Sequence, residues 1–140
     1  MMDIFNVLMV DDEKDFLNTL TKRLVKRGLD ITCANSGEEA LSIVERKKID
    51  VVVLDVRMPG IDGIQTLKDI KKINPSIEVI LLTGHANIDV AMEGMKIGAF
   101  DYLMKPIDID ELLYKIQDAY TNKSILEKKN SISHDAAKKA

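Results

Sequence analysis

The sequence predicts an α/β fold, in which a doubly wound sheet of five parallel strands is covered by five helices. Short apolar runs typical of buried strands alternate five times with segments of helical periodicity, and the connections between them are short. This order calls for right-handed helical crossovers, which place helices on both faces of one sheet. The 140 residues, 46% of them hydrophobic, are enough for the core of a single domain.

The third strand is the most distinctive element. Residues 51–54 are Val-Val-Val-Leu, an apolar run expected of a strand buried on both faces. Asp55 is the first charged residue after this run, and a carboxylate at the end of a buried strand can still reach water and ligands. Met58-Pro59-Gly60 then predicts a turn, because Pro59 lacks an N–H and Gly60 permits a tight bend.

The first part of the chain predicts two strand–helix pairs. The apolar run 4–10 indicates the first strand, and an apolar stripe over 14–27, which includes Phe16, indicates the first helix. The second strand, 30–34, is shorter and more polar, as expected at a sheet edge. Ser36 is a suitable N-cap for the helix that follows.

The remaining elements follow the same alternation. They are expected as a helix over 64–73, a strand over 78–82, a short helix over 87–97, a strand over 102–104 and a helix from about 108 to 120. Asn74 precedes a proline and ends the first of these helices. Asn87 or Asp89 can cap the short helix, which ends at Gly98.

Composition excludes several classes of protein. The formal net charge of −3 provides no basic face for non-specific nucleic-acid binding. No secretory signal or membrane span is visible, and the single Cys33 fits a reducing cytoplasm, where it packs within the second strand. We therefore expect a cytoplasmic protein with no direct contact to nucleic acid or membrane.

Polar side chains follow four of the five predicted strands. They are Asp11 and Asp12 after the first strand, Asp55 after the third, Thr83 at the end of the fourth and Lys105 after the fifth. In sheets of this kind, ligands bind beyond the carboxyl ends of the strands. The sequence therefore predicts that these five side chains meet at one rim of the sheet.

The predicted rim combines a metal site with a nucleophile. Neighbouring carboxylates repel one another by about 1 kcal/mol a pair in water and about 4 kcal/mol at an effective dielectric of 20, and a divalent cation relieves this. Carboxylate oxygens with no His or Cys nearby favour Mg²⁺ or Mn²⁺ over Zn²⁺. A lysine amine and a threonine hydroxyl opposite the metal would complete a cradle for a phosphoryl group. Attack by Asp55 on a phosphoryl donor would give an acyl phosphate.

Taken together, these motifs resemble the receiver domain of two-component response regulators, over about residues 4–120. The matching motifs are Asp11-Asp12, Asp55 with Met58-Pro59-Gly60 and Asp62-Gly63, Thr83-Gly84, and Lys105-Pro106. The resemblance implies a flavodoxin-like receiver fold with strand order 2-1-3-4-5 and a cis Lys105–Pro106 bond.

The resemblance also implies the roles of the site residues. Asp55 would accept a phosphoryl group from a phosphohistidine on a sensor histidine kinase or phosphotransfer protein. Asp12 and Asp55 would bind Mg²⁺ together with the backbone carbonyl of Arg57, while Asp11 assists directly or through water. Lys105 would pair with the phosphoryl group. We expect such a chain to phosphorylate and dephosphorylate itself at Asp55 rather than to turn over a substrate as an ordinary enzyme.

The same resemblance implies a switch. Thr83 would move to hydrogen-bond the phosphoryl group, and Tyr102 stands where the family has an aromatic switch residue. Arg57 and His85 stand where the family has residues that flank the attacking water, although a solvent-facing loop position suits His85 better. The face formed by the fourth helix, the fifth strand and the fifth helix would then dimerise, dock a partner or control an output domain.

Residues 121–140 follow the receiver pattern and are expected to form a helical extension or a disordered tail, with fraying in the last ten residues. Two explanations fit this ending: a single-domain regulator, or the receiver of a longer transcription regulator. The sequence of residues 55–60 and 83–102 resembles that of receivers in enhancer-binding activators, which favours the receiver of a longer transcription regulator.

Two other functional classes have a similar fold. A Mg²⁺-dependent hydrolase with an aspartyl nucleophile, of the phosphatase type, requires a second Asp two residues after the nucleophile, where this chain has Arg57, and a cap domain for which there is no room. A flavin or nucleotide binder requires a phosphate loop after the first strand. Asp11, Asp12 and Glu13 would repel a phosphate there without a metal.

Overall fold

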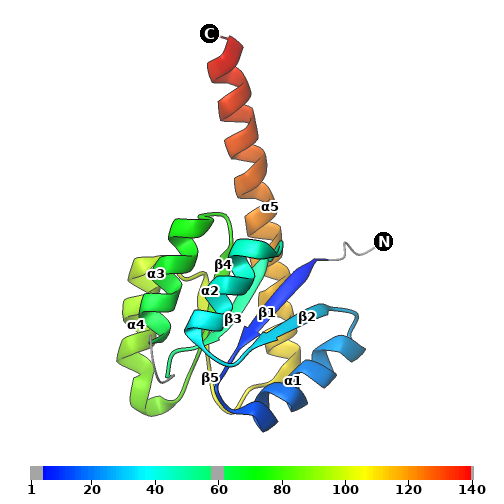
Figure 1. The fold of residues 1–140 in the computed structure, drawn as a ribbon, viewed down its shortest axis with the longest axis vertical. Helices are drawn as coiled ribbons and strands as arrows, with labels where there is room; N and C mark the ends of the chain where they lie inside the picture. The colour runs from blue at the N-terminus through cyan, green and yellow to red at the C-terminus, as the bar shows by residue number, and fades with distance from the viewer. Residues whose placement is uncertain (1–4, 58–61, 140) are drawn as a thin grey trace.

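Five parallel strands form one sheet in the order β2-β1-β3-β4-β5, as expected (Figure 1). The computed structural model describes residues 5–57 and 62–139, with side chains up to residue 129. The strands are β1 (Asn6–Val10), β2 (Asp30–Ala34), β3 (Val51–Asp55), β4 (Glu78–Thr83) and β5 (Asp101–Met104). The helices are α1 (Lys14–Lys26), α2 (Gly37–Arg46), α3 (Gly63–Ile73), α4 (Ile88–Ile97) and α5 (Ile109–Lys139), with a 3₁₀ turn η1 (His85–Asn87). The expected turn at Met58-Pro59-Gly60 lies outside the described residues.

The two faces of the sheet carry two separate apolar clusters. Helices α1 and α5 cover one face, and α2, α3 and α4 cover the other. Strand β3 shows why its sequence is apolar throughout: Val51 and Val53 pack towards α1 and α5, while Val52 and Leu54 pack towards the other three helices. Because successive side chains of a strand point to opposite faces, a strand covered on both sides has no position for a polar residue before its end.

The strand register brings the carboxyl ends together. Val10 lies opposite Leu54, so Asp11 and Asp55, which come next in the chain, are neighbours at the rim. On the other side, Asp55 lies opposite Leu82. The polar residues that follow the buried strands therefore share one edge, where the sequence predicted a site.

The helix ends confirm most of the expected boundary signals. Ser36 caps α2, its Oγ accepting a hydrogen bond from the Glu39 N–H at 3.1 Å. Gly98 ends α4 with a φ of 126°, a backbone conformation that favours glycine. The start of α4 differs from expectation: η1 precedes it, and the side chain of Asn87 makes no cap hydrogen bond. The Lys105–Pro106 peptide bond is cis.

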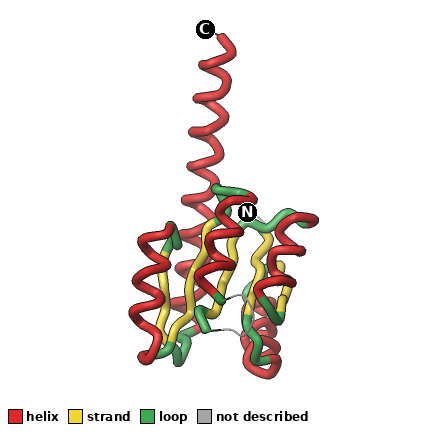
Figure 2. The backbone as a smooth tube through the Cα atoms, turned by 60° about the vertical axis from the view of Figure 1, so that its left-hand side comes forward, coloured by secondary structure: helices red, strands yellow, loops and turns green. Residues whose placement is uncertain are grey.

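Helix α5 is longer than the receiver pattern predicted. It continues as one helix to Lys139, where a frayed end was expected, and its second half projects away from the sheet (Figure 2). Three contacts hold its middle to the amino ends of the strands. Lys123 pairs with Asp50 at 2.8 Å, Asn122 Nδ2 donates to Glu78 Oε2 at 2.7 Å, and the Tyr120 ring stacks on Phe5 at 4.1 Å between centroids. In the part of the chain that the structure describes, no helix has both the length and the apolar character needed to cross a bilayer.

Candidate functional site

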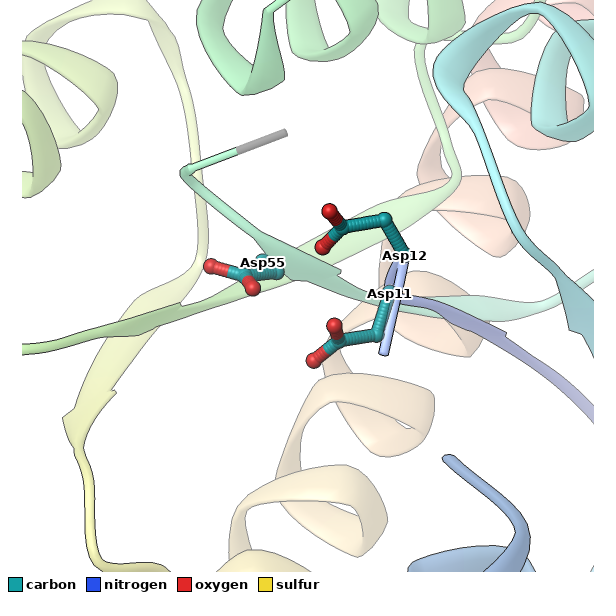
Figure 3. A group of neighbouring side chains, drawn as sticks. All are labelled: Asp11, Asp12 and Asp55. Atoms are coloured by element: carbon teal, nitrogen blue, oxygen red, sulfur yellow. The ribbon is translucent and has the colours of Figure 1, made fainter. Parts of the chain in front are cut away.

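Three carboxylates lie together at the carboxyl ends of β1 and β3. Asp11, Asp12 and Asp55 each offer an oxygen, and these oxygens all lie within 4.8 Å of one another (Figure 3). Asp11 and Asp55 are buried, with 2% and 5% of their surface exposed, while Asp12 is exposed. The acidic cluster predicted from the sequence is therefore present. Two of its carboxylates are buried and the third is exposed to solvent.

Backbone hydrogen bonds orient the two buried carboxylates. Asp11 Oδ1 accepts from the Glu13 N–H at 3.0 Å, and Asp55 Oδ1 accepts from the Arg57 N–H at 3.0 Å. Each Asp thus anchors the loop that follows its own strand, an arrangement common for Asp at turns. The other oxygen of each carboxylate, Oδ2, remains directed to Lys105.

The packing of Gly63 explains the Asp62-Gly63 motif. A Cβ at Gly63 would lie 2.7 Å from Val56 Cα and 2.9 Å from the backbone oxygen of Asp55, closer than side-chain carbons approach backbone atoms. Only glycine lets the first turn of α3 press against the strand end that carries Asp55. Asp62 caps the same turn, accepting from the Gln65 N–H at 2.8 Å.

Lys105 bridges the two buried carboxylates. Its Nζ lies 3.2 Å from Asp55 Oδ2 and 3.5 Å from Asp11 Oδ2. The backbone places it, because the Lys105 N–H donates to Thr83 O at 2.8 Å and so continues the pairing of β4 with β5. Burial lowers the pKa of Lys105, but the charges of Asp55 and Asp11 outweigh burial and leave that pKa above its usual value. The amine is therefore positively charged at neutral pH.

Asp11 has a strongly shifted pKa. Burial is the largest cause and raises it, and the nearby charge of Asp55 raises it further. The hydrogen bond from Glu13 and the charge of Lys105 oppose this, and the pKa of Asp11 remains raised, at about 6. Three carboxylates and one ammonium leave excess negative charge here, and a bound divalent cation would stabilise the ionised form of Asp11.

The donor set fits a hard cation. All three clustered ligands are carboxylates, and the cluster contains no His or Cys among the residues described. Oxygen donors in a partly open site are typical of Mg²⁺, which retains several waters and leaves positions for phosphate oxygens.

The predicted switch residues lie near the site but do not touch its carboxylates. Thr83 is fully buried, and its Oγ1 donates to the backbone oxygen of Gly84 at 3.0 Å. Tyr102 is half-buried against the apolar cluster beneath α2, α3 and α4. His85 is exposed in η1, as its loop position predicted.

An open depression of about 680 Å³ borders the carboxylates of Asp12 and Asp55. Its walls are formed by Asp12, Glu13, Asp55, Arg57, Gly84, Asn87 and Lys105. Sequence reasoning did not identify Glu13 as a wall residue, treated Asn87 as a helix cap and treated Phe16 as part of the core. Yet Lys105 Nζ lies 4.6 Å from the centroid of the Phe16 ring. No motif signals that contact, because it joins the first turn of α1 to the end of β5.

Comparison with known proteins gives a consistent result. The family model described as "Response regulator receiver domain" matches residues 7–117. Transcriptional regulatory protein ZraR of Escherichia coli O157:H7 is 39% identical over 125 residues, which make up 89% of this chain and 28% of ZraR. Regulatory protein AtoC of Escherichia coli K12 is 38% identical over 134 residues, 96% of this chain and 28% of AtoC.

Solved structures agree with these matches. A response regulator receiver domain protein from Clostridium thermocellum has a TM-score of 0.84 and 38% identity, covering 88% of this chain and 99% of its own. NtrX from Brucella abortus, solved with ADP, has a TM-score of 0.87 and 27% identity, covering 93% of this chain and 30% of its own.

The matches also bear on the alternatives. The chain spans less than a third of the length of ZraR and AtoC. The phosphatase-type hydrolase is not supported, because the receiver-domain family model, the regulatory relatives and a receiver structure of 38% identity match this chain. In addition, Arg57 occupies the position where that class needs an acid. The chain belongs to the family of receiver domains found in the response regulators of two-component systems.

Proposed function

We propose that Asp55 accepts a phosphoryl group from a phosphohistidine of a sensor histidine kinase or phosphotransfer protein. The observation that carries this proposal is the position of the Asp55 carboxylate, which ends a rigid buried strand, borders an open depression and lies 3.2 Å from the Lys105 ammonium. A nucleophile held by its strand and facing a cation is arranged for attack on an anionic phosphoryl donor.

The phosphoryl group would pass from the imidazole nitrogen of the donor to Asp55 in a single displacement. A carboxylate oxygen of Asp55 forms a bond to phosphorus as the bond from phosphorus to the imidazole nitrogen breaks, and the imidazole keeps that electron pair. Lys105, whose Nζ lies 3.2 Å from Asp55 Oδ2, would neutralise charge on the phosphoryl oxygens. Water entering the open depression would later cleave the acyl phosphate, which returns Asp55 to its carboxylate form.

Mg²⁺ is the cofactor we propose, and Mn²⁺ has the same preference for oxygen donors. Asp12, Asp55 and the backbone carbonyl of Arg57 would hold it, with Asp11 assisting directly or through water. The exposed Asp12 lets the ion enter from solvent, while the buried Asp11 and Asp55 fix the inner side of the site. The ion, when bound, supplies positive charge that screens the nucleophile from the anionic donor.

A phosphoryl group on Asp55 would reorganise the rim. It adds about −1.5 to −2 charges and strong acceptor oxygens. Thr83 Oγ1 would exchange its bond to Gly84 O for one to the phosphoryl group, since a phosphoryl oxygen is the stronger acceptor. Tyr102, on the strand next to Thr83, would follow and bias α4, β5 and α5 towards a second arrangement.

The output face is proposed to be the surface of α4, β5 and α5. Among the described residues, Met92 on α4 and Tyr114 and Ile125 on α5 are large apolar residues that are exposed, with 47%, 66% and 47% of their surface exposed. This face would form a homodimer or contact an output domain. Control of transcription is proposed because ZraR and AtoC are named as regulatory proteins and extend well beyond the region matched here.

Intact mass measurement tests the proposal. The chain is incubated with acetyl phosphate, with and without Mg²⁺, beside Asp55→Asn. We expect a Mg²⁺-dependent gain of about 80 Da, the mass of one phosphoryl group, which hydroxylamine removes and which the variant does not show. An adduct of equal yield on Asp55→Asn, or one independent of Mg²⁺, would contradict the assignment of Asp55 and its metal.

A further inference from the structure

The Lys105 ammonium has a third neighbour besides the two carboxylates. Its Nζ lies over the face of the Phe16 ring, 4.6 Å from the centroid. A cation over an aromatic face at this distance is attracted by the negative charge of the ring face. Lys105 is therefore held between an acidic side, formed by Asp11 and Asp55, and an aromatic side formed by Phe16.

The local structure fixes the position of the ring. Phe16 lies in the first turn of α1, which starts two residues after Asp12, and the Leu17 N–H donates to Glu13 O at 3.0 Å. The same short segment thus supplies two carboxylates and the ring. Phe16 is only half-buried, at the edge of the cluster that contains the fully packed leucines of α1. Its ring lies beside the Lys105 ammonium at the amino-terminal end of that apolar stripe.

A fixed ring matters because a lysine side chain is flexible. Its four-carbon stem can adopt many rotamers, and its side chain here is 28% exposed. When a metal and a phosphoryl group engage the carboxylates, Lys105 loses the partners that hold it in the resting protein. The ring does not take part in that exchange, so it continues to hold the ammonium beside the phosphoryl oxygens.

We propose that Phe16 is a positioning residue for phosphoryl transfer, because its ring face holds the Lys105 ammonium at the site while Asp55 changes partners. This inference rests on the proposed function of Asp55 and Lys105. It concerns the chemistry at the rim rather than recognition of a kinase, so a small-molecule phosphoryl donor is the appropriate substrate for its test.

Fluorinated phenylalanines separate the charge of the ring face from its size. Mono-, di- and trifluorophenylalanine are placed singly at Phe16, and the rate of phosphorylation by acetyl phosphate is measured at saturating Mg²⁺. Each fluorine withdraws charge from the ring face with little change in volume, so the rate should fall stepwise to about threefold to tenfold below that of the native chain. The same series at Phe5, which stacks on Tyr120 at the other end of the sheet, should leave the rate unchanged.

Two ordinary variants extend the test. Phe16→Tyr retains the ring face, so its rate of phosphorylation should be within about twofold of the native rate. Phe16→Leu lacks the ring, and its rate should fall as far as that of the trifluorophenylalanine variant. Near-native unfolding curves and Mg²⁺ affinity are expected for both. In the resting protein, the ring-current shift of the Lys105 ε-protons should be present in Phe16→Tyr and absent in Phe16→Leu, which reports position without any reaction.

The possible outcomes are distinct. A rate that does not change along the fluorine series at Phe16, in a native chain that Mg²⁺ and acetyl phosphate do phosphorylate at Asp55, would overturn this inference alone. Failure of the native chain to be phosphorylated would instead contradict the proposed function. An equal fall along the Phe5 series would show a general effect of fluorination on the fold and would also overturn the inference.

Discussion

Lys105 and Asp55 are 50 residues apart in the chain, yet Lys105 Nζ lies 3.2 Å from Asp55 Oδ2. The contact arises because β3 and β5 both pair with β4, so that their carboxyl ends lie at the same rim. It places the Lys105 ammonium beside the Asp55 carboxylate, which also borders the open depression. Most of the behaviour expected of this site follows from that arrangement.

Replacement of Lys105 should slow phosphorylation strongly. Lys105→Met should reduce the rate of phosphorylation by acetyl phosphate by about tenfold to a hundredfold. The variant lacks the positioned positive charge that stabilises negative charge on the phosphoryl oxygens in the transition state. Mg²⁺ should bind at least as tightly as before, because the competing ammonium is gone. Rates from intact mass against time provide the measurement, with the exposed Lys22→Met as control. An unchanged rate would remove Lys105 from the mechanism.

The raised pKa of Asp11 predicts how stability without metal depends on pH. Its pKa is about 6 in the folded protein and near 3.8 when unfolded, so folding favours the protonated form. The resulting stability is fully present below pH 3.8 and is lost as the pH rises through about 6. Asp11→Asn mimics the protonated form. It should therefore be more stable than the native chain above pH 7, by up to about 3 kcal/mol, and no more stable near pH 4.

Urea unfolding at pH 4.5 and pH 7.5, in the presence of a chelator, measures this difference. Added Mg²⁺ should raise the stability of the native chain more than that of Asp11→Asn, because the ion compensates the charge that the variant lacks. The prediction is wrong if the native chain is the more stable of the two at pH 7.5 without metal.

Asp12 should determine metal affinity with little effect on folding. It is exposed, so Asp12→Asn should change the free energy of unfolding without metal by no more than about 0.5 kcal/mol. Mg²⁺ affinity should fall about tenfold or more, because a charged ligand becomes neutral. The chain has no tryptophan, so titration calorimetry is the natural measurement. Glu13→Gln, a neighbouring wall residue, serves as the matched control and should bind Mg²⁺ within about threefold of the native chain.

The buried ion pair at the opposite end of the sheet should anchor α5. Lys123 and Asp50 each have only 4% of their side-chain surface exposed. Lys123→Met leaves the Asp50 carboxylate buried without its cation and should cost about 3 to 5 kcal/mol of stability. Lys128→Met, on the exposed part of the same helix, should change stability by no more than about 0.5 kcal/mol. Thermal or urea unfolding distinguishes them, and similar values for both variants would show that the pair is not an anchor.

Sequence alone was sufficient for the architecture, because the fold depends on patterns that repeat locally. The run 51–54 indicated a strand covered on both faces, and β3 is buried at every position. The polar edge strand, the Ser36 cap and the glycine at the end of α4 were likewise readable from nearby residues. The site residues could be named for a related reason: in a parallel sheet, residues after different strands necessarily share one rim.

Distances and partners required the tertiary structure. Nearby residues left open whether the chain beyond residue 120 extends the last helix or forms a tail, and the Lys123–Asp50 pair that holds the extension joins residues 73 apart in the chain. The burial of Asp11 beside an exposed Asp12, which raises one pKa to about 6, depends on how the loop after β1 turns. The place of Phe16 beneath Lys105 depends on where α1 packs relative to β5. Local sequence therefore determined which residues reach the rim, and only the packing of distant segments decided what each of them touches there.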